Sequence, residues 1–131
     1  MSKRPEPPIR AISILVGIMI GCVLAYAFQV NIPTLFHETY VWASLVIFVT
    51  TPVLAGFVTG LIHPELALKN GMYVGFFSGI FNSIIAAIKF VYATEVMPSE
   101  IYAFSMFIIV SVFLWMILAA TAAILAQKFY E

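Results

Sequence analysis

Charged residues are scarce in this sequence, and the formal net charge of the 131-residue chain is zero. Asp, Glu, Lys and Arg together make up 9% of the residues, whereas hydrophobic residues make up 63%. Without a basic or acidic excess, the chain has no broad charged face for nucleic acid or another charged partner. A soluble domain of this length could not bury so much apolar surface, so the composition predicts a lipid bilayer around the chain.

Side chains for metal or covalent chemistry are also few. The single cysteine, Cys22, lies in an apolar run, and we expect it to be a small apolar filler because an internal disulfide needs two. The two histidines, His37 and His63, are expected at opposite membrane faces, where they cannot share a metal ion or a haem iron. No nucleophile with a neighbouring base is apparent. We therefore expect no enzyme activity, no metal and no cofactor.

Carboxylates are missing from the long apolar segments. Proton and cation transporters carry ionisable side chains inside the membrane. Here every carboxylate falls in a predicted tail or loop. Lys89 lies near the end of a predicted span, from which its ammonium group can extend to the membrane surface. This pattern counts against proton or cation transport.

The sequence does contain four apolar segments of about 20 residues or more, the length that a helix needs to cross a bilayer. Short polar connections with proline or charged residues separate them, as expected where helices stop. We therefore predict an all-α integral membrane four-helix bundle with one transmembrane domain, 11–127. The predicted spans are 11–30, 40–62, 71–93 and 102–127, and the predicted tails are 1–10 and 128–131.

Lysine and arginine gather on one side of this bundle, which is typical of the cytoplasmic side. They are Lys3, Arg4, Arg10, Lys69 and Lys128. Aromatic residues gather at the other boundary like an aromatic belt, and they are Tyr26, Tyr40, Trp42, Tyr92 and Tyr102. We predict cytoplasmic N- and C-termini in a multi-pass protein of the cell (inner) membrane, with Glu38, Glu95 and Glu100 outside.

The first 27 residues also resemble a signal peptide, with a basic start, an apolar middle and the motif AYA at 25–27. The apolar run nevertheless reaches spanning length and contains Gly17 and Gly21, which suit a packed helix. We therefore expect a retained first span. Cleavage after the motif is the alternative, and N-terminal sequencing of the mature protein distinguishes the two.

Small residues recur every four positions along the predicted spans. The glycines in this spacing are Gly17, Gly21, Gly56, Gly60, Gly71, Gly75 and Gly79. The fourth span has alanines instead, with Ala119 and Ala123 in register. Helices in lipid associate through close packing, which such stripes permit. The stripes predict tight helix packing, and the alternatives are a channel wall of bare backbone or a contact with another chain.

A faint internal duplication is present. "VGIMIG" at 16–21 and "VGFFSG" at 74–79 share the pattern Val-Gly-x-x-x-Gly, in spans that should run in the same direction. The returning spans share a Leu-Ala start in "LAGFVTG" at 54–60 and "LAATAA" at 118–123. Two copies of one helical hairpin would produce this 2+2 pattern.

One amide, Asn82, lies near the middle of the third predicted span. Folding the chain about the second loop places it at the depth of Thr50, Thr51 and Pro52. Pro52 lacks an amide donor and frees the carbonyl of Phe48 one turn earlier. We predict that Asn82 hydrogen-bonds to this proline-interrupted segment, and the alternative is a polar site for a small ligand or ion.

The motifs "VGIMIG", "AGFVTG" and "NGMYVGFFSG" repeat a Gly-x-x-x-Gly ladder over residues 11–93. In this the chain resembles a group of small, uncharacterised four-span membrane proteins of archaea and bacteria. The alanine-rich fourth span departs from their pattern. The resemblance implies a four-span membrane fold and brings no catalytic or cofactor-binding residues with it.

These observations favour a non-enzymatic membrane protein that acts through helix contacts. It would self-associate as a homo-oligomer or serve as an accessory subunit of a membrane complex, with the lipid bilayer as its other partner. The alternative is a small channel or transporter for a neutral or anionic solute, lined by glycine backbone, serine and Asn82. A third candidate, lipid or quinone binding between spans, has no distinguishing residues.

Overall fold

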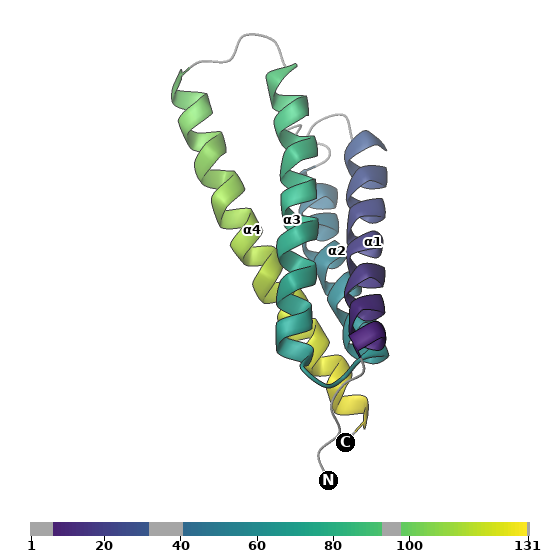
Figure 1. The fold of residues 1–131 in the computed structure, drawn as a ribbon. Helices are drawn as coiled ribbons and strands as arrows, with labels where there is room; N and C mark the ends of the chain where they lie inside the picture. The colour runs from purple at the N-terminus through teal and green to yellow at the C-terminus, as the bar shows by residue number, and fades with distance from the viewer. Residues whose placement is uncertain (1–6, 32–40, 93–97, 131) are drawn as a thin grey trace.

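A computed structural model describes residues 7–31, 41–92 and 98–130 of the chain, and these form four long α-helices and one short 3-10 helix (Figure 1). The elements are α1 (Pro7–Asn31), α2 (Val41–Ile62), α3 (Ala67–Val91), α4 (Pro98–Gln127) and the 3-10 turn η2 (Lys128–Tyr130). All four helices are long and apolar enough to cross a membrane. This confirms the predicted all-α architecture with four candidate spans.

Three helices begin before the predicted spans do: α1 at Pro7, α3 at Ala67 and α4 at Pro98. Hydropathy marks only the apolar part of a helix, whereas the hydrogen-bonded backbone continues into the polar boundary. Proline suits the first turn of a helix because the amide it lacks would have no intrahelical partner there. The described helices therefore extend beyond the apolar runs that predicted them.

A tight turn at residues 63–66 joins α2 to α3. The amide of His63 still donates to the carbonyl of Thr59, at 3.1 Å, so α2 closes at this point. Leu66 then takes a left-handed conformation (φ 59°), and its carbonyl accepts from the amide of Asn70 at 2.9 Å. The turn reverses the chain within four residues and makes α2 and α3 antiparallel neighbours.

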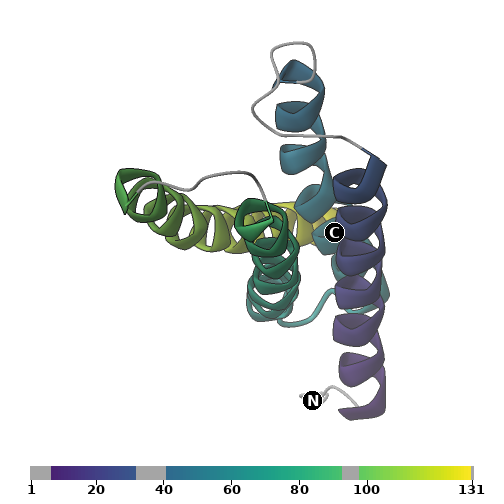
Figure 2. The ribbon, with the colours of Figure 1, turned by 90° about the horizontal axis from the view of Figure 1, so that it is seen from above.

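We call the end of the molecule that carries this turn the turn end, and the opposite end the open end. The start of α1 and the end of α4 also lie at the turn end (Figure 1). Towards the open end α4 leaves α3, and in the view from above α2 and α4 lean in different directions (Figures 1 and 2). Helices α2, α3 and α4 therefore lie close together at the turn end and spread at the open end.

Burial follows the same division. Along its whole length α1 buries the residues Ser13, Gly17, Gly21, Ala25 and Gln29. In α2 the buried residues begin at Thr51, and none of the described side chains from 42 to 50 is buried. In α4 they begin at Ser111, and none of those described from 100 to 110 is buried. The α1–α3 pair thus packs over its full length, while α2 and α4 are buried only in their turn-end halves.

Two adjacent stripes on α3 explain its central place in the fold. One stripe is buried at four-residue spacing and faces α1, and it consists of Asn70, Val74, Ser78, Asn82 and Ala86. The second stripe, displaced by one position, consists of Gly71, Gly75 and Gly79 and faces α4. Residues at i and i+4 share a helix face, so one helix serves two neighbours at once.

Candidate functional site

The two glycines of α2 lie against the backbone of α4. A methyl group added at Gly56 would come within 2.6 Å of the Cα atom of Ala119, and one at Gly60 within 2.8 Å of that of Ala123. Such distances leave no room for any side chain. The alanines of the fourth predicted span therefore supply the opposite surface of the same close contact.

The glycines of α3 also approach α4, but not all equally. A methyl group at Gly71 would lie 2.7 Å from the Cα atom of Ala120, and one at Gly75 would lie 2.6 Å from that of Met116. At Gly79 the nearest atom, Trp115 Cβ, would be 3.4 Å away, which is close to ordinary contact. The α3–α4 contact is thus tightest near the turn end and loosens towards the open end.

The glycines of α1 face the side chains of α2 and α3. A methyl group at Gly17 would lie 2.7 Å from Val74 Cγ2, and one at Gly21 would lie 2.6 Å from Ser78 Cβ. All seven glycines are therefore covered by another helix of the same chain. A glycine that lines a channel would instead face open space, so these stripes do not form a channel wall within one chain.

Asn82 contacts a residue that the sequence analysis did not single out. Gln29 Nε2, from α1, donates to the Oδ1 atom of Asn82 at 2.8 Å and to its backbone carbonyl at 3.2 Å. Both side chains are more than nine-tenths buried. The amides therefore tie α1 to α3 inside the apolar part of the bundle.

The predicted bond from Asn82 to the segment at Thr50, Thr51 and Pro52 is wrong. The Thr50 hydroxyl donates to the carbonyl of Val46 at 2.6 Å, and the Thr51 hydroxyl donates to that of Ile47 at 2.8 Å. Both threonine hydroxyls thus bond within their own helix, although Thr50 is exposed and Thr51 is buried. Asn82 and this segment were predicted to bond because they lie at equal depth on adjacent spans. Equal depth does not make them neighbours, since the α3 face that carries Asn82 points to α1.

Lys89 also turns inwards to α1. Its Nζ atom donates to the backbone carbonyl of Gln29 at 2.8 Å, and its side chain is only partly exposed. This carbonyl belongs to the last turn of α1, where carbonyls have no intrahelical donor. A cation at this end also complements the helix dipole. Lys89 thus caps a neighbouring helix and does not simply extend to the surface.

A second polar group, which we call the turn-end cluster, consists of Arg10, His63, Asn70 and Tyr73. Arg10 Nε donates to Asn70 Oδ1 at 2.9 Å, and the guanidinium carbon lies 5.9 Å from the centroid of the Tyr73 ring. Asn70 is fully buried, and its Nδ2 atom lies 3.1 Å from His63 Nδ1 and 3.3 Å from the carbonyl of Glu65. The cluster joins the start of α1 to the α2–α3 turn.

This chain of bonds assigns the protonation pattern of His63. Arg10 is a donor, so it fixes the acceptor end of the Asn70 amide and directs the Nδ2 donor to His63 Nδ1. In this arrangement the Nδ1 atom accepts, which corresponds to the tautomer with its ring hydrogen on Nε2. Within the described part of the chain, the buried Nε2 atom of His63 has no hydrogen-bond partner.

From the sequence His63 was expected at a membrane face and Asn70 was not singled out, so the cluster was missed. The signal that could have found it is the spacing of Asn70, Ser78 and Asn82, which are eight and four residues apart and so lie on one face of a largely apolar helix. His37, Glu38 and Glu95 lie outside the described residues.

Aromatic side chains bridge the spreading helices at the open end. The rings of Phe90 and Phe104 stack with centroids 4.3 Å apart, and Phe104 lies 6.2 Å from Phe107. Phe48 of α2 continues the series, at 6.2 Å from Phe107 and 5.7 Å from Trp115. The indole nitrogen of the buried Trp115 has no partner among the described residues.

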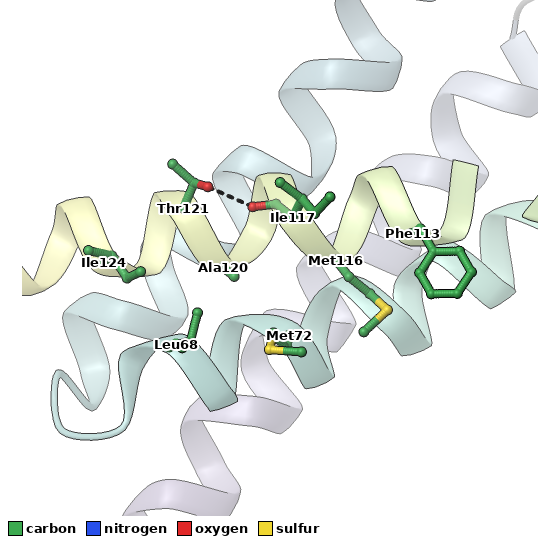
Figure 3. A pocket seen from close by; sticks show the side chains of 8 residues that line it. All are labelled: Leu68, Met72, Phe113, Met116, Ile117, Ala120, Thr121 and Ile124. Carbon is green, nitrogen blue, oxygen red and sulfur yellow. Dashed lines mark hydrogen bonds between the residues drawn. The ribbon is translucent and has the colours of Figure 1, made fainter. Parts of the chain in front are cut away.

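A shallow apolar groove of about 350 Å³ runs between α3 and α4 on the surface of the molecule (Figure 3). Its lining residues are Leu68, Met72, Phe113, Met116, Ile117, Ala120, Thr121 and Ile124. The one hydroxyl, that of Thr121, donates to the carbonyl of Ile117 at 2.8 Å within α4. The groove therefore offers no polar group that would orient a ligand.

Among residues 7–31, 41–92 and 98–130, no three His, Cys, Asp or Glu side chains gather in a way that could hold a metal ion. The polar groups that the fold does bring together include amides, the Arg10 guanidinium, the His63 imidazole and the Lys89 ammonium group, and their bonds join helices. Comparison with protein-family models, curated proteins and solved structures finds no match for this chain.

Proposed function

We propose that this chain is a non-enzymatic multi-pass membrane protein that works by binding other transmembrane helices. It would do so as a homo-oligomer or as an accessory subunit of a larger membrane complex. The observation that supports this is the exposure of the open-end halves of α2 and α4, in contrast to the close packing of their turn-end halves.

The glycine stripes are occupied by contacts within the chain, so an external contact must use other surfaces. The open-end halves of α2 and α4 offer such a surface, with large exposed side chains that include Trp42, Val46, Tyr102 and Val110. Helices in lipid gain stability from shape complementarity, since lipid tails are as apolar as the side chains they replace. A helix from another chain seated between α2 and α4 would add to the packing of this half, which within the chain rests on aromatic contacts such as those of Phe48 and Phe104.

The channel alternative receives no support from the described residues. Its expected lining was glycine backbone, serine and Asn82, but the glycines lie against other helices and Asn82 bonds to Gln29. For orientation we rely on the excess of lysine and arginine, and propose cytoplasmic termini in the cell membrane.

The first test is the native mass of the purified protein in mild detergent. We expect a defined oligomer, or a complex with a second chain in fixed stoichiometry. A stable lone monomer, in detergent and after reconstitution in lipid nanodiscs, would contradict the proposal.

The second test locates the contact with single cysteines in a Cys22→Ala background. Val110→Cys lies in the open-end half of α4, and Leu125→Cys is the matched control in the turn-end half. The native side chains are 59% and 55% exposed, so the two sites differ in position and little in accessibility. We expect bismaleimide cross-links to a copy or a partner chain at 110 and none at 125. Equal cross-linking at both sites would contradict a contact at the open end.

A further inference from the structure

We propose that Arg10 binds the phosphate of a membrane phospholipid at the turn end, with its guanidinium group held in position by Asn70 and Tyr73. This site is separate from the helix contacts at the open end. The Arg10 guanidinium group is a planar, charged fork of N–H donors, which would recognise the phosphate oxygens.

The first step is that Arg10 is ordered before any ligand arrives. Its Nε atom donates to Asn70 Oδ1 at 2.9 Å, and its guanidinium carbon lies over the Tyr73 ring at 5.9 Å from the centroid. Asn70 in turn is fully buried and bonded to the imidazole of His63 and the carbonyl of Glu65. A side chain that is held in this way loses little further freedom when it binds, and this favours affinity.

The second step concerns the donors that remain. A guanidinium group has five N–H bonds, of which the Nε–H takes part in the bond to Asn70. Within the described part of the chain, the two terminal nitrogens make no hydrogen bond and Arg10 has no carboxylate partner. Arg10 is also only partly buried, as a residue that binds a ligand at the surface must be. Two parallel N–H bonds in one plane match two oxygens of a phosphate group.

The third step is the depth of the site. Arg10 is the first residue of the apolar stretch Arg10–Gln29 in α1, and Asn70 and Tyr73 lie in the first turns of α3, directly after the turn at 63–66. The guanidinium group is therefore at the boundary between the apolar bundle and its polar end. Phospholipid phosphates lie at this boundary, and basic pockets between transmembrane helices bind lipid head groups there.

Two other described basic residues near this end, Lys69 and Lys128, lack the same support. Both are exposed, and neither ammonium group forms a hydrogen bond within the described part of the chain. A lysine ammonium group acts as a mobile point charge and does not offer a planar fork. Lys69, one residue before Asn70, is therefore a matched control, since its removal changes the local charge by the same amount as the removal of Arg10.

The test is native mass spectrometry of the full chain in mild detergent with added phosphatidylglycerol. We expect Arg10→Gln to weaken retention of the lipid about tenfold, since a charge-assisted bidentate contact is lost. Lys69→Gln should weaken it less than about twofold. Arg10→Lys keeps the charge but not the fork, and we expect it to lose most of the retention as well.

Several results would overturn the proposal. One is equal retention by Arg10→Gln and the unmodified protein, and another is equal losses in Arg10→Gln and Lys69→Gln. Full retention by Arg10→Lys would mean that charge alone acts and that the held fork does not. Displacement of the lipid by excess inorganic phosphate would assign the site to a soluble anion instead. Helical circular dichroism and gel-filtration profiles of each variant separate loss of binding from loss of fold.

Discussion

At the scale of single residues, the amides of this protein act as bridges between α1 and α3. Gln29 reaches Asn82 in the apolar part of the pair, and Asn70 receives Arg10 at its turn end. An interhelical hydrogen bond in a membrane contributes about 0.6 kcal/mol on average and occasionally near 2 kcal/mol, because the separated helices also find partners. Each hydrogen bond thus contributes modestly to the stability of the α1–α3 pair and helps to fix how the two helices align along their axes.

We expect Asn82→Leu to lower the free energy of unfolding by about 0.6–2 kcal/mol, because the Gln29 amide loses its side-chain acceptor inside the bundle. Reversible unfolding in mixed detergent and dodecyl sulfate measures this quantity. Thr121→Val is the control, since that exposed hydroxyl bonds only to its own helix, and it should change stability by no more than about 0.5 kcal/mol. Equal stability of Asn82→Leu and the unmodified protein would show that the bridge contributes nothing.

The sequence identified Asn82 as a buried polar residue but not its partner. The depth of a residue along a span can be predicted from hydropathy and loop position. Such depths are most easily compared between consecutive spans, here the second and the third. The rotation of each helix about its own axis decides which face meets which neighbour, and for α3 two different faces are buried at once. Gln29, near the end of its predicted span, was not singled out from the sequence, although it is more than nine-tenths buried and bonds to Asn82 of α3.

At the scale of elements, the close approach of α3 to α4 varies along the glycine stripe. At Gly75 a methyl group would meet the backbone of Met116 at 2.6 Å, whereas at Gly79 the closest atom would be 3.4 Å away. The first is an impossible contact and the second is nearly ordinary. The two glycines are equivalent in sequence spacing. Their contacts differ because α3 and α4 cross at an angle, and that angle depends on how both helices pack.

This difference gives a matched pair of substitutions. We expect Gly75→Ala to destabilise the fold by about 1–3 kcal/mol, since the methyl group must push two helix backbones apart. Gly79→Ala should be neutral, or stabilising by up to about 1 kcal/mol, because alanine favours the helix over glycine. Thermal unfolding of both variants in the same detergent compares them directly. Equal loss in both would mean that the stripe does not have the graded contact described above.

At the scale of the whole molecule, the four-helix architecture could be predicted because apolar length alone identifies spans. The spreading of α2 and α4 could not be predicted, since hydropathy carries no information on crossing angles. Straight helices that cross closely at one end must separate towards the other. The aromatic rings between Phe90 and Trp115 occupy part of that widening space, and no periodicity in the sequence identified them as one group.

Orientation in the membrane can be checked with cysteine accessibility in whole cells, again in a Cys22→Ala background. We expect Lys69→Cys, next to the α2–α3 turn, to react with an impermeant maleimide only after the cells are opened. Glu100→Cys, in the first turn of α4 at the other end, should react in intact cells. The reverse pattern would place the termini outside.

Helix α4 contacts α3 closely near Trp115 and Met116, so a change in its tilt about this contact would displace its open end. From Trp115 to the start of α4 at Pro98 the arm is about 26 Å long, at 1.5 Å per residue, so a tilt of about 10° would move its tip by about 4 Å. Shifts of a few tenths of an ångström at the glycines are thereby amplified at the far end. Gly71 and Gly75 thereby influence the position of that tip from a distance, in addition to the Phe90–Phe104 stack beside it.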